Sequence, residues 1–197
     1  MFIIASFGNV RNEMRKILLT SAGFETKHII EVFHGLFDKK PAEIKALFIP
    51  TAANSQSGIE FLPKCMNDLI KAGILSEYIC VFDLHRNMDV DELLKYDVVY
   101  FTGGSSEYLL ERINDTGFNK SLKQYIDKGG VYVGVSAGSI VAVNNLSDGL
   151  NLVNCTLDVH TSSGTEVGLI NTDENPHIDL TDENVILILG DKCEVMK

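Results

Sequence analysis

Ser136 lies at the centre of the stretch with the clearest chemical pattern in the sequence, Gly-Val-Ser-Ala-Gly at 134–138. The apolar residues 131–133 before it are typical of a buried strand, and residues 139–142 after it can begin a helix. A G-x-S-x-G pattern between a strand and a helix is typical of a sharp turn that presents a serine hydroxyl beside unpaired helix N–H groups. The pattern predicts a nucleophilic serine, and the alternative is a tight turn of small residues without chemistry.

A serine needs a neighbouring base to take its proton before it can attack a carbonyl group. Two of the five histidines lie downstream of the serine and are candidates for this base. His160 closes the apolar stretch 152–159, which places it at a strand end, whereas His177 lies in an Asn-Pro-His sequence that is typical of an exposed turn. We expect the remaining three histidines on the solvated surface: His28, His34 and His85.

The base in turn needs a carboxylate that orients it. Four downstream carboxylates are available, and their spacing alone does not rank them: Asp158, Asp179, Asp182 and Glu183. The oxyanion that forms in acyl transfer also needs N–H donors. The Ala137 N–H directly follows the serine, and the Gly103-Gly104 pair can bring a second N–H close because it has no side chains. An ordinary strand-to-helix turn is the alternative interpretation of that glycine pair.

The elements that must position these residues alternate between apolar strands and amphipathic helices. We expect strands at 2–6, 46–49, 78–82, 98–101 and 131–135. We expect helices at 12–19, at 27–37, from a first turn at Pro63 to a cap at Gly73, and at 90–95, 107–113 and 119–128. This alternation predicts an α/β fold, a doubly wound, mostly parallel sheet with helices on both faces. The Gly190-Asp191 pair predicts a C-terminal β-hairpin over 185–196.

Composition restricts the class of protein. A chain of 197 residues with 45% hydrophobic and 22% charged residues fits one globular domain, 1–197. The formal net charge of −10 argues against nucleic acid and anionic membranes as partners. No apolar run approaches the ~20 residues that span a bilayer, and the start lacks the cationic region of a signal peptide. Four cysteines without C-x-x-C spacing predict reduced, mostly buried thiols of a cytoplasmic protein: Cys65, Cys80, Cys155 and Cys193.

An ordered set of motifs from about Leu47 to the C-terminus resembles the S51 family of serine peptidases, which contains dipeptidase E and cyanophycinase. The motifs are, in order, Phe-Ile-Pro-Thr-Ala at 48–52, Phe-Thr-Gly-Gly at 101–104 followed by Tyr-Leu-Leu at 108–110, Gly-Val-Ser-Ala-Gly at 134–138, Gly-Leu-Asn-Leu-Val at 149–153 leading to His160, and Leu-Thr-Asp-Glu-Asn-Val-Ile at 180–186. The ordered set is far more specific than any one of its members.

The resemblance implies a three-layer, flavodoxin-like fold similar to class I glutamine amidotransferases, with serine in place of their cysteine. It implies Ser136 as the nucleophile, His160 as the base, and the Gly104 and Ala137 amides as the oxyanion hole. The family's acidic residue, usually Glu, is replaced here by Asp182, with Glu183 as the alternative. No metal and no organic cofactor are implied. The expected partner is a short peptide substrate, and a homodimer is compatible with the sequence.

Two departures from the family pattern bear on the substrate. The segment between Ser136 and His160 is short for the family, and the chain carries no Lys or Arg between Lys128 and Lys192. The dipeptidase E branch selects an N-terminal Asp, whose carboxylate calls for a cation, ideally a bidentate Arg. We therefore expect a serine peptidase of short peptides with weak or altered Asp preference. The alternatives are a catalytically inactive relative that binds or scaffolds, and a nucleotide binder, which the absence of a phosphate-loop motif disfavours.

Overall fold

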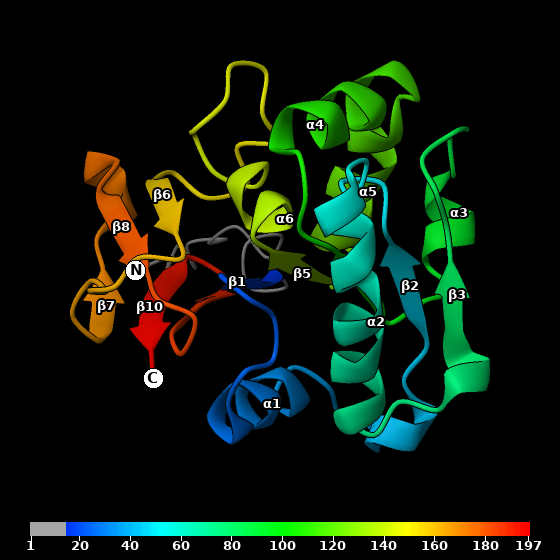
Figure 1. Ribbon diagram of the computed structural model, residues 1–197, viewed down its shortest axis with the longest axis horizontal. Helices are drawn as coiled ribbons and strands as arrows, with labels where there is room; N and C mark the ends of the chain where they lie inside the picture. Colours follow the sequence, from blue (N-terminus) through cyan, green and yellow to red (C-terminus); the bar gives the residue numbers. More distant parts are fainter. Residues whose placement is uncertain (1–14) are drawn as a thin grey trace, which may run out of the picture.

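The computed structural model describes residues 15–197. Its centre is an eight-stranded mixed sheet (Figure 1). In chain order the strands are β1 (Lys16–Thr20), β2 (Ala46–Ile49), β3 (Ile79–Val81), β4 (Val98–Phe101), β5 (Val131–Val135), β7 (Gly168–Ile170), β9 (Val185–Leu189) and β10 (Lys192–Met196). The strand predicted at 2–6 lies outside the described residues.

The strands lie in the order β3-β2-β4-β5-β1-β9-β10-β7. The first five pair in parallel, whereas β9, β10 and β7 run antiparallel to their neighbours. The mostly parallel sheet and the C-terminal hairpin are thus confirmed. In Figure 1, β3 and β7 lie at opposite ends of the molecule.

The short helix predicted at 12–19 is wrong, because β1 occupies Lys16–Thr20 in the middle of the sheet. This strand pairs in parallel with β5 and antiparallel with β9. Its residues Ile17, Leu18 and Leu19 are all fully buried. A strand covered on both faces needs consecutive apolar residues rather than alternating ones, and this short run has that pattern.

Six α-helices connect the strands of the described chain: α1 (Lys27–His34), α2 (Gln56–Lys71), α3 (Val90–Leu93), α4 (Ser106–Asp115), α5 (Phe118–Asp127) and α6 (Ala137–Ile140). Short 3-10 turns cover Pro41–Glu43, Ser76–Tyr78 and Thr172–Glu174. Within residues 15–197, no helix combines the length and apolar character needed to cross a bilayer.

Helix α2 begins earlier than predicted. The Ser55 side chain accepts a hydrogen bond from the Gly58 N–H and caps the helix at Gln56. Pro63 therefore lies inside the helix instead of in its first turn. The missed signal was the serine cap. Gly73 follows the helix with φ of +87°, the conformation expected of a C-terminal cap.

Helices cover both faces of the sheet, as predicted. Along β4, Val98 and Tyr100 pack with residues of α1 and α2 in one core. The alternating residues Val99 and Phe101 pack on the other face, with α4 and α5. The result is a three-layer α/β fold in which the central strands are buried from both sides.

A small second sheet pairs β6 (Thr156–Val159) with β8 (His177–Leu180) in parallel. It lies toward the β7 and β10 end of the molecule (Figure 1). The stretch around His177, expected to be an exposed turn, thus begins a strand, although the His177 side chain is exposed. Val159 and Leu180 are register partners, so the residues that follow these two strands emerge side by side.

The fold predicts that one of the four thiols reacts rapidly with a thiol reagent at pH 8. Burial raises the pKa of Cys65 and Cys193 to about 11 and that of Cys155 to about 12, so little reactive thiolate forms at these positions. Cys80 alone is exposed among the four. We expect one fast equivalent with dithiobisnitrobenzoate in the native protein and four after unfolding. Cys80→Ser should remove the fast phase, and additional fast thiols in the native protein would contradict the packing.

Candidate active site

Ser136 lies between β5 and α6 with φ of 48° and ψ of −105°, a backbone conformation that residues other than glycine rarely adopt. Hydrogen bonds hold the chain on both sides of it. The Ser136 N–H donates to the Thr20 carbonyl oxygen at 3.0 Å, and the Ser136 carbonyl accepts from the N–H groups of Ser139 and Ile140. The hydroxyl is therefore presented at the carboxyl ends of β5 and β1.

The glycines of the Gly-Val-Ser-Ala-Gly motif are needed for close packing. A Cβ atom on Gly134 would lie 2.6 Å from the Gly138 carbonyl oxygen. A Cβ atom on Gly138 would lie 2.7 Å from the Cβ atom and 2.8 Å from the carbonyl oxygen of Phe101. Since such contacts are well inside van der Waals distance, the strand, turn and helix can approach this closely only with glycine at both positions.

The two small-sheet strands bring His160 and Asp182 together. His160 directly follows β6, and Asp182 is two residues beyond the end of β8. Asp182 also precedes β9, whose first residue Val185 is the register partner of Thr20 at the end of β1. The parallel pairing of β6 with β8 and the antiparallel pairing of β9 with β1 therefore converge on the carboxyl ends of the central strands.

The three side chains predicted to act together are in contact. Ser136 Oγ lies 3.2 Å from His160 Nε2. His160 Nδ1 lies 2.9 Å from Asp182 Oδ1. The His160 and Asp182 side chains are both half-exposed. An imidazole held at Nδ1 by a carboxylate and facing a hydroxyl with Nε2 can accept the hydroxyl proton.

Ser21 also belongs to this cluster, although the sequence pattern did not predict it as a site residue. Its hydroxyl accepts a hydrogen bond from the His160 backbone N–H at 2.7 Å and donates to Asp182 Oδ1 at 2.6 Å. It follows β1, which was expected to be helical. The signal was present as the apolar run 17–19 followed by Thr-Ser-Ala-Gly, a buried strand entering a turn of small residues.

The pKa of Asp182 lies below its usual value of 3.8. Partial burial pushes this pKa upward, but hydrogen bonds from Ser21 and His160 and the electrostatic attraction of Lys64, and of His160 whenever its ring is protonated, outweigh it. Asp182 is thus ionised at neutral pH. Because folding lowers this pKa, the ionised carboxylate stabilises the fold above pH 3.8, and that contribution is lost as the pH falls through the lowered pKa.

Two backbone segments, the start of α6 and the Gly103-Gly104 pair, lie beside Ser136. Ala137 is the first residue of α6, so its N–H has no acceptor within the helix. On the other side, a Cβ atom on Gly103 would lie 3.2 Å from the Cβ atom of Ser136. Gly104 has φ of +141°, and any side chain there would overlap the Ala52 carbonyl group. The Gly103-Gly104 turn therefore brings bare backbone next to the serine.

A cavity of about 350 Å³ opens next to Ser136. Its walls come from α2 and its cap, from the glycine turn and from the residues in contact: Ser55, Ser57, Gly58, Phe61, Gly103, Gly104, Ser136 and His160. Apart from the imidazole of His160, these described lining residues carry no ionisable side chain. The cavity is therefore lined by hydroxyls, bare backbone, the Phe61 ring and the His160 imidazole.

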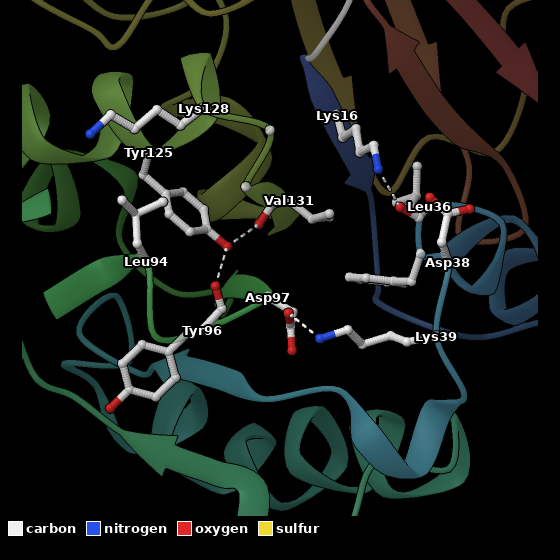
Figure 2. A pocket seen from close by; sticks show the side chains of 13 residues that line it. Lys16, Leu36, Asp38, Lys39, Leu94, Tyr96, Asp97, Tyr125, Lys128 and Val131 are labelled. Atoms are coloured by element: carbon white, nitrogen blue, oxygen red, sulfur yellow. Dashed lines mark hydrogen bonds and ion pairs between the residues drawn. The ribbon is translucent and has the colours of Figure 1, made fainter. Parts of the chain in front are cut away.

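A second cavity, of about 330 Å³, lies at the amino ends of the strands (Figure 2). Three of the charged groups that line it already have partners. Lys39 pairs with Asp97 at 2.7 Å, and Lys16 donates to the Leu36 carbonyl oxygen at 2.8 Å. None of the predicted site residues lines this cavity.

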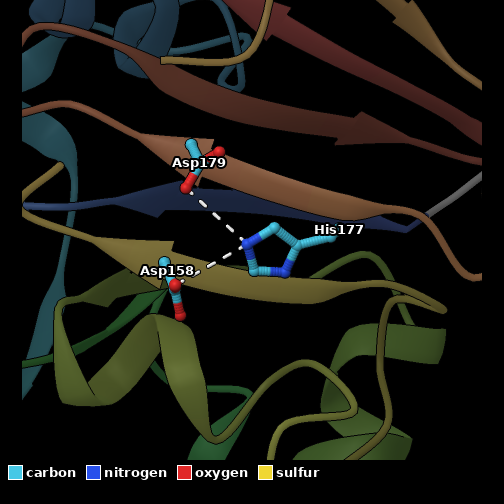
Figure 3. A group of neighbouring side chains, drawn as sticks. All are labelled: Asp158, His177 and Asp179. Atoms are coloured by element: carbon cyan, nitrogen blue, oxygen red, sulfur yellow. Dashed lines mark ion pairs between the residues drawn. The ribbon is translucent and has the colours of Figure 1, made fainter. Parts of the chain in front are cut away.

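The other candidate base, His177, forms a separate cluster (Figure 3). Its Nε2 atom lies 3.6 Å from carboxylate oxygens of both Asp158 and Asp179, and its Nδ1 atom lies 3.0 Å from Thr156 Oγ1. The ligand atoms of His177 and the two aspartates lie within 4.8 Å of one another, so this exposed group has the donor types to hold a metal ion.

Glu183, the alternative partner of His160, turns toward the C-terminus and pairs with Lys197 at 3.1 Å. Asp158 and Asp179 are engaged with His177. Of the four carboxylates considered from the sequence, Asp182 is the one whose hydrogen bond to His160 is present among the described residues.

Fold and site together define a three-layer α/β protein with a serine, a histidine and a carboxylate at the carboxyl ends of its strands. The chain belongs to peptidase family S51, whose family model matches residues 17–194. Its family resemblance and its expected fold are thus confirmed.

Individual relatives agree with this assignment. The chain is 25% identical over 133 residues to the uncharacterized peptidase PM1590 of Pasteurella multocida (strain Pm70), and 27% identical over 134 residues to the uncharacterized peptidase Lmo0363 of Listeria monocytogenes serovar 1/2a. Each match covers 68% of this chain. The chain spans 62% and 63% of the length of these two relatives.

Solved structures share the fold. A crystal structure of a candidate peptidase E from Listeria monocytogenes EGD-e superposes with a TM-score of 0.74 and 21% identity, over 93% of this chain and 98% of that one. The structure of a peptidase from an acI-B1 actinobacterium gives a TM-score of 0.65 and 19% identity, over 93% and 87% of the two chains.

The packing of the serine turn predicts the effect of adding one methyl group. Gly138→Ala forces a Cβ atom against the Phe101 backbone, so we expect it to lower the free energy of unfolding by about 1–3 kcal/mol. Gly35→Ala is the matched control, because Gly35 caps α1 with φ of −62° and an alanine there should change stability by less than about 0.5 kcal/mol. Urea unfolding measures both, and equal midpoints for the two variants would contradict the packing.

Proposed function

We propose that this protein is a serine peptidase that hydrolyses short peptides. Ser136 acts as the nucleophile, His160 as the general base and Asp182 as the residue that orients the base. The observation that carries the proposal is the 3.2 Å contact between Ser136 Oγ and His160 Nε2, in a turn that holds the serine backbone in a strained conformation. Family membership supports hydrolysis of peptides as the reaction.

The reaction begins when Ser136 Oγ attacks the peptide carbonyl carbon while His160 Nε2 takes the hydroxyl proton. A tetrahedral intermediate forms, and the imidazolium then donates its proton to the leaving amine as the C–N bond breaks. Water then enters, gives a proton to His160 and attacks the acyl carbon. As the acyl–oxygen bond breaks, His160 returns this proton to Ser136 Oγ, and the acid is released. Asp182, ionised at neutral pH, stabilises the imidazolium in both halves.

The oxyanion of the tetrahedral intermediate would lie between the N–H groups of Gly104 and Ala137. Support comes from the free position of the Ala137 N–H at the start of α6 and from the bare backbone at Gly104. Donors fixed in place before the reaction cost no rearrangement when the charge develops, which is why such a pair lowers the barrier.

The cavity next to Ser136 favours a substrate with a neutral side chain. Among residues 15–197, no lysine or arginine lines this cavity to pair with a carboxylate. Lys64 lies on the same helix as the lining residues Ser57 and Phe61, but its ammonium group contacts Glu25 at 2.5 Å and Asp68 at 2.9 Å. A substrate aspartate would therefore be desolvated in this cavity without a partner.

We also propose a cytoplasmic protein that acts without a cofactor. All four cysteines are free, which suits a reducing compartment. The net charge of −10 disfavours nucleic acid and anionic membrane surfaces as partners.

A second candidate function is a catalytically inactive relative that binds peptides in the same cavity. The observation in its favour is the exposure of the His160 and Asp182 side chains, 51% each, because water weakens the electrostatic support that a carboxylate gives to an imidazole. Turnover separates the two functions, since both predict peptide binding and only one predicts an activated serine.

Labelling with a fluorophosphonate tests the activated serine directly. We expect the wild-type protein to be labelled once per chain and Ser136→Ala to be unlabelled. His160→Gln should slow labelling by about 10²-fold or more, because the base is lost. Ser57→Ala, which removes a hydroxyl from the cavity wall, serves as the control for non-specific labelling and should keep the modified site at Ser136. Absence of labelling in the wild type would favour the inactive relative.

A dipeptide series tests substrate selection. We expect kcat/KM for Ala-Xaa and Ser-Xaa to exceed that for Asp-Xaa by about tenfold or more, because an unpaired buried charge costs at least 1.4 kcal/mol. Ser57→Arg places a guanidinium beside the cavity and should raise the relative rate for Asp-Xaa. Strong Asp selectivity in the wild type would contradict a neutral site.

A further inference from the structure

Ser21 is fully buried at the carboxyl end of β1, between the two halves of the candidate site. The preceding residue, Thr20, accepts the Ser136 N–H through its carbonyl oxygen. Ser21 itself contacts His160 and Asp182. Two consecutive residues, the last of β1 and the first after it, therefore hold the serine on one side and its partners on the other.

The hydrogen atoms of this cluster can be assigned without conflict. Ionised Asp182 is an acceptor only, so the Ser21 hydroxyl proton points to Asp182 Oδ1, and a lone pair of Ser21 Oγ accepts the His160 backbone N–H. Asp182 Oδ1 also accepts from the ring of His160, which places the ring proton on Nδ1. The remaining ring nitrogen, Nε2, then faces Ser136 with its lone pair.

The backbone of His160 is itself strained, with φ of +58°. This left-handed conformation is unfavourable for a residue with a side chain and persists when neighbouring groups hold it. The bond from the His160 N–H to Ser21 Oγ, at 2.7 Å, is such a restraint. Ser21 thus fixes His160 at its backbone as well as through the carboxylate that its ring contacts.

We propose that Ser21 is a positioning residue of the active site: it holds His160 in the orientation and tautomer that accept the Ser136 proton. This inference rests on the proposed function, because it assigns a role within the same reaction. Ser21 does not line the cavity beside Ser136, so its contribution is to the chemical step and not to substrate binding.

Ser21→Ala tests the role in turnover. We expect kcat to fall about tenfold to a hundredfold with KM unchanged, the size that loss of hydrogen bonds to charged groups produces. Ser121→Ala is the matched control, since Ser121 is a buried serine on α5 away from the site, and its kcat should stay within about twofold. Ser21→Thr keeps the hydroxyl and should recover part of the lost rate. An unchanged kcat in Ser21→Ala overturns the proposal.

A double-mutant cycle separates positioning from a general structural effect. If Ser21 acts through Asp182 and His160, then Ser21→Ala in an Asp182→Asn background should cost less than about threefold in kcat, because the group it supports is already impaired. Fluorophosphonate titration gives the fraction of competent protein in each variant, which removes misfolded protein from the comparison. If the fold reduction in kcat of the double variant equals the product of the two single reductions, Ser21 acts independently of Asp182, and the proposal is overturned.

A measurement that does not require catalytic turnover tests the role of Ser21 separately from the proposed function. Nitrogen-15 NMR of histidine-labelled protein, with His160 assigned by His160→Gln, reports which ring nitrogen carries the proton. We expect the Nδ1-protonated form in the wild type and in Ser121→Ala, and a mixture of tautomers in Ser21→Ala. If the wild type proves inactive but shows this difference, the peptidase proposal fails and the role of Ser21 in orienting His160 stands. Identical spectra for wild type and Ser21→Ala would overturn it.

Discussion

The candidate site depends on how the chain leaves β1. At this point the Thr20 carbonyl accepts the Ser136 N–H, and the next residue, Ser21, hydrogen bonds to both His160 and Asp182. Buried Ser139 further fixes the serine turn to β1, because its hydroxyl hydrogen bonds to both the N–H and the carbonyl oxygen of Thr20. A central strand buried on both faces has little freedom to shift, so it provides a rigid reference for groups that arrive from three different parts of the sequence.

Strained backbone is concentrated at the same place. Ser136 and His160 both have positive φ, and Gly104 occupies a conformation in which a side chain would overlap Ala52. Such conformations cost free energy and persist where surrounding bonds impose them. Here the imposed geometry has a clear consequence, since Ser136, His160 and the Gly103-Gly104 turn all line one small cavity. The strained backbone thus lowers the stability of the fold and holds the reactive groups in fixed positions relative to one another.

Much of this arrangement could be predicted from local patterns, and the failures have physical causes. The strands at 46–49, 98–101 and 131–135 were predicted with their observed limits, because each is a short apolar run bounded by turn residues. The strand β1 was missed because three consecutive apolar residues fit a helix or a buried strand equally well. Ser21 was missed with it. The pairing of β6 with β8, which selects Asp182 over the other carboxylates, depends on register between distant segments, and local patterns do not contain that information.

A crystal structure of the protein after reaction with a small fluorophosphonate tests the central claim most directly. Our account predicts a single adduct on Ser136 Oγ, with a phosphonyl oxygen within hydrogen-bond distance of the Gly104 and Ala137 N–H groups. It also predicts that His160 and Asp182 remain bound to Ser21. An adduct on another residue, or a Ser136 adduct whose oxygen points away from both amides with His160 detached from Ser21, would contradict it.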